Sequence, residues 1–363
     1  MIYVWLVLVF ILGLAVGSFL NVCISRLPLE KSVLWPMGSR CGHCLQAIRW
    51  YDNIPLLSYF LLRGRCRTCG TSFSMRYPII ELFTGLSFAG LFYLEVVVNV
   101  HHWSLLQGEQ LAIQRGVIAW QAWVLFGFHA ILFSFLLAAA ACDLEHREIP
   151  LSLTVTGTVI GLLGAVLFPW PWPYTLSSAG QTILLNRPWW QLPPHLSPPM
   201  GLYPWPVWGP LPDWLPPGSW QLGLATGLAG MFMGTWLVRI IGGIFTQGLG
   251  KEAIGLGDAD LMMMAGAFLG WQLVVVAFFL AVIPGLFCAI AQLVLHGDRT
   301  LPFGPALALG VVMTWLGWHW IAPRVQPLFF FEYLLLFMVI ASAVFLFLSA
   351  VMLRKMRGSE EEA

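Results

Sequence analysis

The stretch Gly255-Leu256-Gly257-Asp258-Ala259-Asp260-Leu261 decides the fold, because it opens an apolar run that continues to Leu269. It places an acidic side chain at the mouth of a predicted membrane helix. Burying a carboxylate at bilayer depth is costly unless the group faces water or a partner, so such a group is read first as functional. The two glycines lower the cost of irregular backbone and let another segment approach closely.

The composition extends this interpretation to the whole chain. Of 363 residues, 59% are hydrophobic and 10% are charged, and the mean hydropathy is +0.80. A soluble domain carries about 25% charged residues, so the sequence predicts an all-α polytopic membrane protein in contact with lipid. The net charge of +1 gives no indication of nucleic acid as a partner. The N-terminus lacks the basic region and cleavage site of a secretory signal, so it is interpreted as the first spanning helix.

Nine apolar segments are predicted to cross the membrane, since about 20 apolar residues span a bilayer. The sixth of them, 259–270, is shorter than the others. The segments lie at about 3–22, 79–98, 119–141, 151–169, 222–245, 259–270, 273–295, 304–321 and 331–353.

Basic residues predict the orientation of these segments, because cytoplasmic loops carry an excess of Lys and Arg. The loop 23–77 holds eight of the 18 basic residues, and placing it in the cytoplasm puts 15 inside and three outside. The N-terminus then lies outside and the C-terminus inside. This arrangement puts Asp258 at the cytoplasmic side together with a second acid, Asp143, which also ends a long apolar segment. Two carboxylates at one membrane level could share a proton and activate one water, as in an aspartyl protease.

The loop 23–77 contains two Cys-x-x-Cys pairs, Cys41-Gly42-His43-Cys44 and Cys66-Arg67-Thr68-Cys69. Four thiolates on two tight turns suit tetrahedral zinc. Two disulfides are the alternative, which a reducing cytoplasm disfavours. The sequence therefore predicts structural zinc on Cys41, Cys44, Cys66 and Cys69. His43 is interpreted as a loop residue rather than a ligand.

Two outer loops are predicted on the other side of the membrane. Residues 169–221 hold 14 of the 24 prolines and 8 of the 19 tryptophans, and this density of proline forbids a regular helix. In the shorter loop 101–118, His101 and His102 are expected to be solvated, because no acidic or cysteine partner is near in sequence.

These features divide the chain into six predicted parts. They are a first transmembrane helix at 1–22, a cytoplasmic zinc-binding loop domain at 23–77, transmembrane helices carrying Asp143 at 78–168, a periplasmic Pro/Trp-rich insertion at 169–221, transmembrane helices carrying the Gly-x-Gly-Asp motif at 222–353, and a cytoplasmic tail at 354–363.

A series of motifs in one order resembles the bacterial type IV prepilin peptidases, which are bifunctional leader peptidases and N-methyltransferases. The series covers most of the chain outside 99–118, 169–221 and the last predicted helix. The matching motifs are Gly17-Ser18-Phe19-Leu20-Asn21-Val22, Arg26-Leu27-Pro28, the paired Cys-x-x-Cys, Asn53-Ile54-Pro55-Leu56-Leu57-Ser58, Leu62-Arg63-Gly64-Arg65-Cys66, Arg76-Tyr77-Pro78-Ile79-Ile80-Glu81-Leu82, Asp143 with Ile149-Pro150, Gly255 to Leu261, and Pro302-Phe303-Gly304-Pro305 with Ala308-Leu309-Gly310.

The resemblance implies a multi-pass enzyme of the bacterial inner membrane with its active site at the cytoplasmic side. Its catalytic residues would be Asp143 and Asp258, and its substrates prepilin or pseudopilin precursors of type IV pili or type II secretion. It also implies S-adenosylmethionine as methyl donor. Glu81 matches a glutamate of the family and is a candidate for a substrate or methyltransfer role; the alternative is a helix-end residue paired with a neighbouring Arg.

Two positions depart from the family pattern. Leu151 stands where the family usually has Asp or Asn, and Asp260 where it usually has Lys. Neither change removes a presumed catalytic group, although Asp260 should raise the local negative potential. Two other classes remain open from the residues alone: a proton-coupled transporter that uses Asp143 and Asp258, and a zinc-containing assembly protein without catalysis.

Overall fold

The computed structural model describes residues 1–169 except 34, 36, 37 and 107; residue 172; 213–249 except 217; 255–296; 302–329; and 337, 339–342, 344–349 and 351–352. Most of the predicted insertion 169–221, the tail 354–363 and part of the last predicted helix lie outside these residues. Within them, the regular structure is helical apart from two isolated β-bridges. The prediction of an all-α protein is confirmed.

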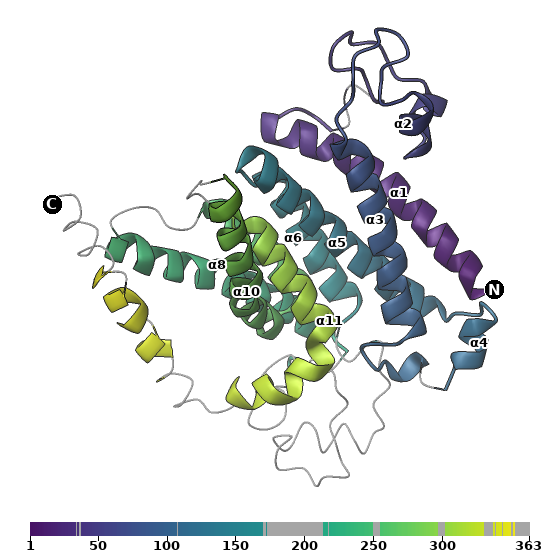
Figure 1. Ribbon diagram of the computed structural model, residues 1–363. Coiled ribbons are helices and arrows are strands. Elements are labelled where there is room, and N and C mark those ends of the chain that lie inside the picture. Colours follow the sequence, from purple (N-terminus) through teal and green to yellow (C-terminus); the bar gives the residue numbers. More distant parts are fainter. Residues whose placement is uncertain are drawn as a thin grey trace, which may run out of the picture. The chain divides into compact units, whose positions relative to one another are not determined.

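The chain forms two compact units, Met1–Pro150 and Leu151–Ala363 (Figure 1). The first contains α1 (Ile2–Arg26), η1 (Leu27–Leu29), η2 (Trp50–Asn53), α2 (Leu57–Leu61), α3 (Arg76–Phe92), the π-helical turn η3 (Tyr93–Val97), η4 (Ser104–Leu106), α4 (Gln110–Gln114) and α5 (Trp120–His146). The second contains α6 (Leu151–Leu167), α8 (Trp220–Leu249), α9 (Leu256–Leu269), α10 (Trp271–His296) and α11 (Gly304–Phe329). The helix at 151–167, which the sequence grouped with the segment carrying Asp143, is thus part of the second unit.

Among the described residues, six helices are long and apolar enough to cross a membrane, which supports a multi-pass membrane protein. They coincide with the predicted segments 3–22, 79–98, 119–141, 222–245, 273–295 and 304–321. The predicted segments 151–169 and 259–270 fold as helices of 17 and 14 residues, which are shorter than the about 20 residues that usually span a bilayer. The predicted number of nine crossings is therefore not confirmed.

In the first unit, α1 and α3 pack side by side through small residues on α1 (Figure 1). A Cβ added to Gly13 would lie 2.8 Å from the carbonyl oxygen of Thr84, and one added to Gly17 would lie 2.8 Å from the Cα of Glu81. Membrane helices associate through such small-xxx-small faces because their backbones can approach closely. This contact places Glu81 of α3 directly beside Gly17 of α1.

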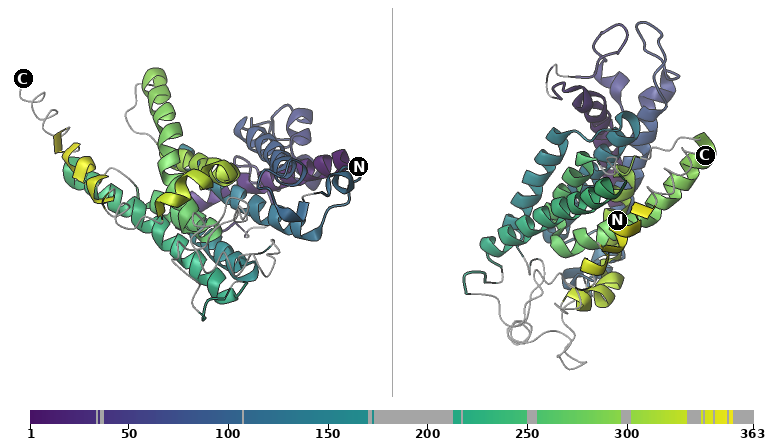
Figure 2. Two further views of the ribbon diagram at one scale, coloured as in Figure 1. Left: turned by 90° about the horizontal axis from the view of Figure 1, so that it is seen from below. Right: turned by 90° about the vertical axis from the view of Figure 1, so that its left-hand side faces the viewer.

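In the second unit, α9 packs against α8 and α6, and Figure 2 shows these teal to green helices running together. A Cβ on Gly230 would lie 2.0 Å from the Gly266 carbonyl oxygen, and one on Gly234 would lie 2.2 Å from that of Met262. The backbones of α8 and α9 therefore touch along a Gly-x-x-x-Gly face. This packing holds the first turn of α9 and its acidic residues in place.

Candidate functional site

Asp143 lies in the last turn of α5, with its side chain directed into the protein interior. Only 8% of the residue is exposed, whereas Leu144, Glu145, His146, Arg147 and Glu148 are all exposed. Arg147 adopts a left-handed conformation (φ 56°), and its N–H donates to the Asp143 carbonyl oxygen at 2.9 Å. This hydrogen bond closes the helix, and Pro150 three residues later prevents its continuation. Among these charged neighbours, the structure thus buries the predicted acid alone.

An ion pair links the ends of α3 and α5. Arg76, the first residue of α3, contacts the carboxylate of Glu145, which lies in the last turn of α5. Its guanidinium also stands over the ring of Tyr77, 4.8 Å from the centroid. Because Glu145 is two residues beyond Asp143, the pair anchors the helix end that carries this acid.

Asp258 lies in the first turn of α9, where Gly255 is the N-cap residue. It is also only 8% exposed, while Gly255 and Leu256 are exposed. Asp260 is only partly buried, and Arg239 on α8 attracts its carboxylate electrostatically. From Asp260 the sequence predicted a more negative local potential around Asp258. The positive charge of Arg239 offsets part of the charge of Asp260.

The cysteine loop consists of two turns with the same backbone pattern. Cys41 N–H donates to the Gln46 carbonyl oxygen at 3.0 Å, and Cys66 N–H to that of Thr71 at 2.8 Å. An isolated antiparallel bridge closes each turn, Arg40 with Ala47 and Arg65 with Ser72. In each, the residue four positions after the first cysteine has positive φ, namely Leu45 (57°) and Gly70 (73°). The two Cys-x-x-Cys pairs therefore lie on two copies of one backbone turn, here called the knuckles.

The four cysteine sulfurs of these knuckles lie within 4.8 Å of one another. Cys41 Sγ and Cys69 Sγ are 3.7 Å apart, and sulfurs at about 2.3 Å from a tetrahedral zinc are separated by about 3.8 Å. Hydrogen bonding with the Thr71 hydroxyl and backbone lowers the pKa of the Cys69 thiol to about 6. The arrangement of the four sulfurs fits zinc,. His43 is not part of the group.

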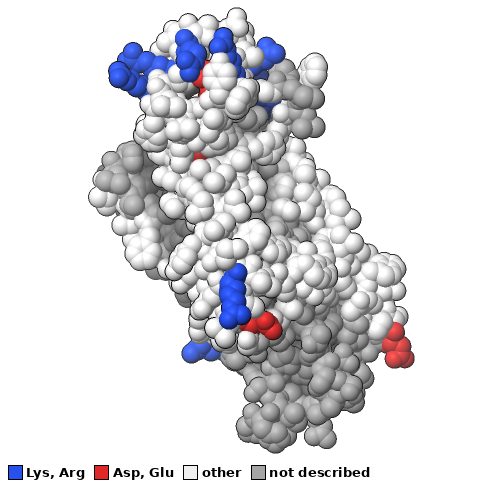
Figure 3. Space-filling model, turned by 90° about the vertical axis from the view of Figure 1, so that its right-hand side faces the viewer, with Lys and Arg blue, Asp and Glu red and all other residues white. Residues whose placement is uncertain are grey.

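The surface of this loop is basic. Arg40, Arg49, Arg63, Arg65 and Arg67 are exposed there, and Figure 3 shows Lys and Arg gathered at the end of the first unit that the loop forms. Arg67 and Asp52 form a salt bridge in which Arg67 Nη2 donates a hydrogen bond to Asp52 Oδ1 at 2.7 Å. Hydrogen bonding from Arg67 holds the pKa of the Asp52 carboxyl below its usual value. The predicted excess of basic residues is thus concentrated on one exposed face.

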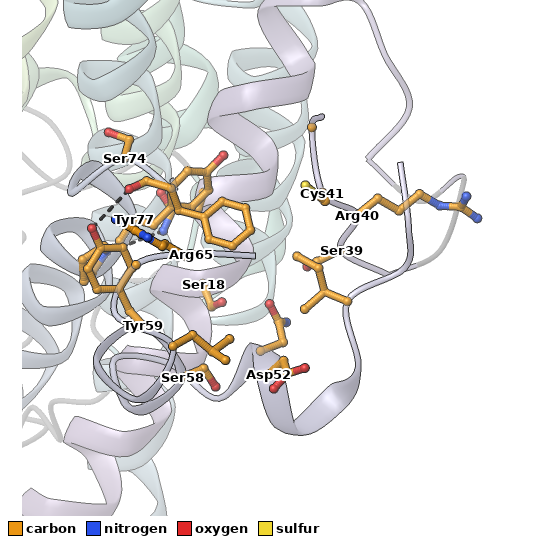
Figure 4. Close-up of a pocket in the computed structure, with 18 of the residues that line it drawn as sticks. Ser18, Ser39, Arg40, Cys41, Asp52, Ser58, Tyr59, Arg65, Ser74 and Tyr77 are labelled. Atoms are coloured by element: carbon orange, nitrogen blue, oxygen red, sulfur yellow. Dashed lines mark hydrogen bonds between the residues drawn. The ribbon is translucent and has the colours of Figure 1, made fainter. Parts of the chain in front are cut away.

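A cavity of about 460 Å³ lies between this loop, α1 and the start of α3. Figure 4 shows Ser18 of α1, and Tyr59 and Asp52 of the loop, around it, with Arg40 pointing away. Buried Asn21 also lines the cavity; its Nδ2 donates to the Tyr77 carbonyl oxygen at 3.0 Å, but its Oδ1 has no hydrogen-bond partner among the described residues. The cavity therefore offers a buried acceptor to a ligand that carries a hydrogen-bond donor.

Glu81 lines the same cavity and is 8% exposed. Its Oε2 accepts a hydrogen bond from the Leu56 backbone N–H at 2.8 Å. Among the described residues no ion pair joins Glu81 to an Arg, which was the alternative, and Arg76 contacts Glu145. Glu81 therefore holds the loop on α3 and presents a carboxylate to the cavity.

A second group of possible metal ligands was missed in the sequence. Glu95, His101 and His129 lie together at the other end of α3. The expectation that His101 is solvated is wrong, because its side chain is only 10% exposed and its Nε2 lies 3.4 Å from a Glu95 carboxylate oxygen. Glu95 and His129 each interrupt an apolar run, and this signal alone could have marked them as functional.

Comparison with known proteins agrees with the order of the motifs. Residues 11–94 match the family described as Bacterial Peptidase A24 N-terminal domain, and residues 213–290 match the Type IV leader peptidase family. Among solved structures, none matches the chain.

Several characterised proteins are similar over most of this chain. One named Prepilin leader peptidase/N-methyltransferase from Pectobacterium carotovorum subsp. carotovorum is 31% identical over 83% of this chain and 89% of its own length. The Type 4 prepilin-like proteins leader peptide-processing enzyme of Escherichia coli O78:H11 is 30% identical over 83% and 90%. A Prepilin leader peptidase/N-methyltransferase from Myxococcus xanthus is 31% identical over 80% of this chain and 64% of its own length. The chain therefore belongs to the type IV leader peptidase family.

Proposed function

We propose that this protein is a membrane aspartyl endopeptidase that removes the short leader of type IV prepilin-like precursors and methylates the new N-terminal residue. Family membership supports both activities. The observation that carries the peptidase half is the burial of Asp143 and Asp258, each 8% exposed at a helix end. Burying a carboxylate in an apolar helix costs free energy, so such a residue is read first as functional.

Asp143 and Asp258 are proposed to form one dyad. The N-terminal end of a helix favours negative charge and the C-terminal end disfavours it. Asp258 lies in the first turn of α9, and Asp143 in the last turn of α5. We therefore assign the ionised general base to Asp258 and the protonated carboxyl to Asp143.

In the proposed reaction, Asp258 removes a proton from a water molecule, whose oxygen attacks the scissile carbonyl carbon. The Asp143 carboxyl donates a hydrogen bond to the carbonyl oxygen as it gains charge. Collapse of the tetrahedral intermediate breaks the carbon–nitrogen bond, and the leaving amine takes up a proton from the dyad. The reaction consumes one water and returns both carboxyl groups to their starting protonation states.

The proposed location is the bacterial inner membrane, with the dyad at the cytoplasmic side. The excess of basic residues in 23–77 supports this orientation,. A prepilin or pseudopilin precursor would keep its leader in the cytoplasm and its apolar helix in the lipid. Its scissile bond would then meet the dyad at the interface.

Zinc is proposed to bind Cys41, Cys44, Cys66 and Cys69, because the donor set and the separation of the sulfurs fit this ion,. Its role there is structural. The loop has few buried apolar residues of its own, so the metal would hold the two knuckles together. Residues of both knuckles, such as Cys41 and Thr71, line the side of the cavity that the loop forms.

The methyl donor is proposed to occupy the cavity between the loop, α1 and α3. S-adenosylmethionine supplies an electrophilic methyl group when bound. The volume of about 460 Å³ suits a ligand of this size,. The Asn21 Oδ1 and the Glu81 carboxylate would accept hydrogen bonds from its amino and hydroxyl groups, and the negative charge of Glu81 would favour its cationic sulfonium,.

The test is a two-part assay with purified full-length protein and a prepilin substrate. Asp143→Asn and Asp258→Asn should each abolish cleavage and yet methylate a precleaved pilin with a free N-terminus. Glu145→Gln, whose amide oxygen can still accept a hydrogen bond from Arg76, and Asp260→Asn are matched controls two residues beyond each aspartate. Both should retain most of the cleavage. Efficient cleavage by the Asp258→Asn protein would exclude the aspartyl mechanism.

A further inference from the structure

A compact cluster of one carboxylate and two imidazoles lies at the end of α3 opposite the cysteine loop. Glu95 belongs to the π-helical turn η3 and is fully buried. Its Oε1 lies 2.7 Å from His129 Nδ1 and 3.4 Å from His101 Nε2. One ligand atom from each of the three residues lies within 4.8 Å of the others. π-Helical turns inside α-helices occur frequently at functional sites.

The local structure holds both imidazoles in place. His101 stacks on Trp103, with ring centroids 5.2 Å apart and an interplanar angle of 22°. Trp103 is itself fixed by Asn99, whose Nδ2 donates to the Trp103 carbonyl oxygen at 3.0 Å and whose Oδ1 accepts from the Trp103 N–H at 2.8 Å. His129 comes from the middle of α5, 34 residues from Glu95. The loop and two helices thus present their side chains to one point.

The carboxylate of this cluster is incompletely satisfied. Glu95 Oε1 contacts both histidines, whereas Oε2 is buried and has no hydrogen-bond partner among the described residues. A buried carboxylate oxygen without a partner is rare and requires an explanation, and a bound ion is one. The side chains of His101 and His129 are 10% and 13% exposed, so the cluster is not fully closed off from solvent.

We propose that Glu95, His101 and His129 bind a divalent transition-metal ion of the Zn²⁺ class, separate from the four-cysteine site. Two imidazoles and one carboxylate are a recurrent zinc ligand set, and a water completes the tetrahedron. The ion would satisfy the carboxylate and join η3 to α5. Since α3 and η3 together, Arg76–Val97, are long enough to span the membrane, the two metal sites of the first unit would lie at opposite ends of one helical span.

Zinc stoichiometry of the intact protein tests the proposal without any variant. The full-length protein in detergent is saturated with Zn²⁺, freed of excess ion and analysed by elemental mass spectrometry. Two zinc ions per chain are expected, and one per chain would overturn the proposal. Glu95→Gln and His129→Gln should each reduce the count to one. His102→Asn, at an exposed neighbour outside the cluster, should keep it at two.

Cobalt distinguishes the two sites, because only cysteine ligation gives intense sulfur-to-metal charge-transfer absorption. The Glu95→Gln protein loaded with Co²⁺ should keep this absorption and lose one equivalent of bound metal. Where a cluster variant does not fold, the decisive protein is the one with Ser at all four knuckle cysteines. It should still bind one Zn²⁺. No bound zinc in that protein, or an unchanged count of two in the Glu95→Gln and His129→Gln proteins, would exclude the site.

Discussion

The carboxylate of Glu81 and the backbone N–H of Leu56 form a 2.8 Å hydrogen bond that ties the cysteine loop to α3. Leu56 has a positive φ of 59°, so the loop turns sharply at this point. The remainder of the carboxylate faces the cavity that we assign to the methyl donor. The Glu81 side chain thus has two roles: its hydrogen bond to Leu56 positions the loop, and its negative charge acts on the cavity.

Glu81→Gln should separate these two roles. The amide oxygen can still accept from Leu56 N–H, so the loop should stay in place and prepilin cleavage should remain near the wild-type rate. Loss of the negative charge should lower the methylation rate at least about tenfold, because a hydrogen bond to a charged group contributes about 1.5 kcal/mol or more. Parallel assays of cleavage and of methyl transfer to precleaved pilin measure the two effects. Equal loss of both activities would leave Glu81 a purely structural role.

Cys66→Ser should remove the zinc ion from the knuckles, because three remaining thiolates and a hydroxyl bind it far more weakly. The cysteine loop should then become sensitive to limited proteolysis. Cys288→Ser, on α10 in the other unit, is the control and should change neither metal content nor cleavage pattern. Wild-type zinc content in the Cys66→Ser protein would mean that the knuckles do not form the metal site.

The sequence predicted the knuckles and the two aspartates because their signals are local. Four cysteines at fixed spacing leave little choice of geometry, and an acid that ends a long apolar run stands out from its surroundings. Whether the two acids act together remains a prediction, since it depends on contacts between distant segments.

The cluster of Glu95, His101 and His129 could not be assembled from sequence neighbours. His101 was judged by the residues beside it, whereas its partners lie on a π-helical turn and on α5. Such contacts depend on which helices pack against each other, and residues adjacent in sequence do not show this. The packing of α6 against α8 depends in the same way on close backbone contacts, such as that of Gly223 with the Ala165 carbonyl oxygen.

Gly234→Ala should destabilise the second unit, because the added Cβ would lie 2.2 Å from the Met262 carbonyl oxygen on α9. Forcing the two backbones apart costs about 1–3 kcal/mol or more. Gly243→Ala on the same helix meets no atom within 4 Å and should be neutral or stabilising by up to about 1 kcal/mol, from helix propensity. Thermal unfolding in detergent compares the two. Equal stability of both variants would exclude the close α8–α9 contact.

The double variant Asp143→Asn/Asp258→Asn gives the sharpest test of a shared dyad. An amide cannot ionise or share a proton, so each single change should lower the cleavage rate by a factor on the order of 10⁴ or more. If the aspartates act as one unit, removing the second after the first should cost little further, and the double variant should match the slower single one. Two independent contributions would instead multiply. Single-turnover cleavage of a detergent-solubilised prepilin measures all three rates, and unchanged zinc content and melting temperature show that the variants are folded. Multiplicative losses would mean that Asp143 and Asp258 serve separate steps, such as catalysis and substrate binding.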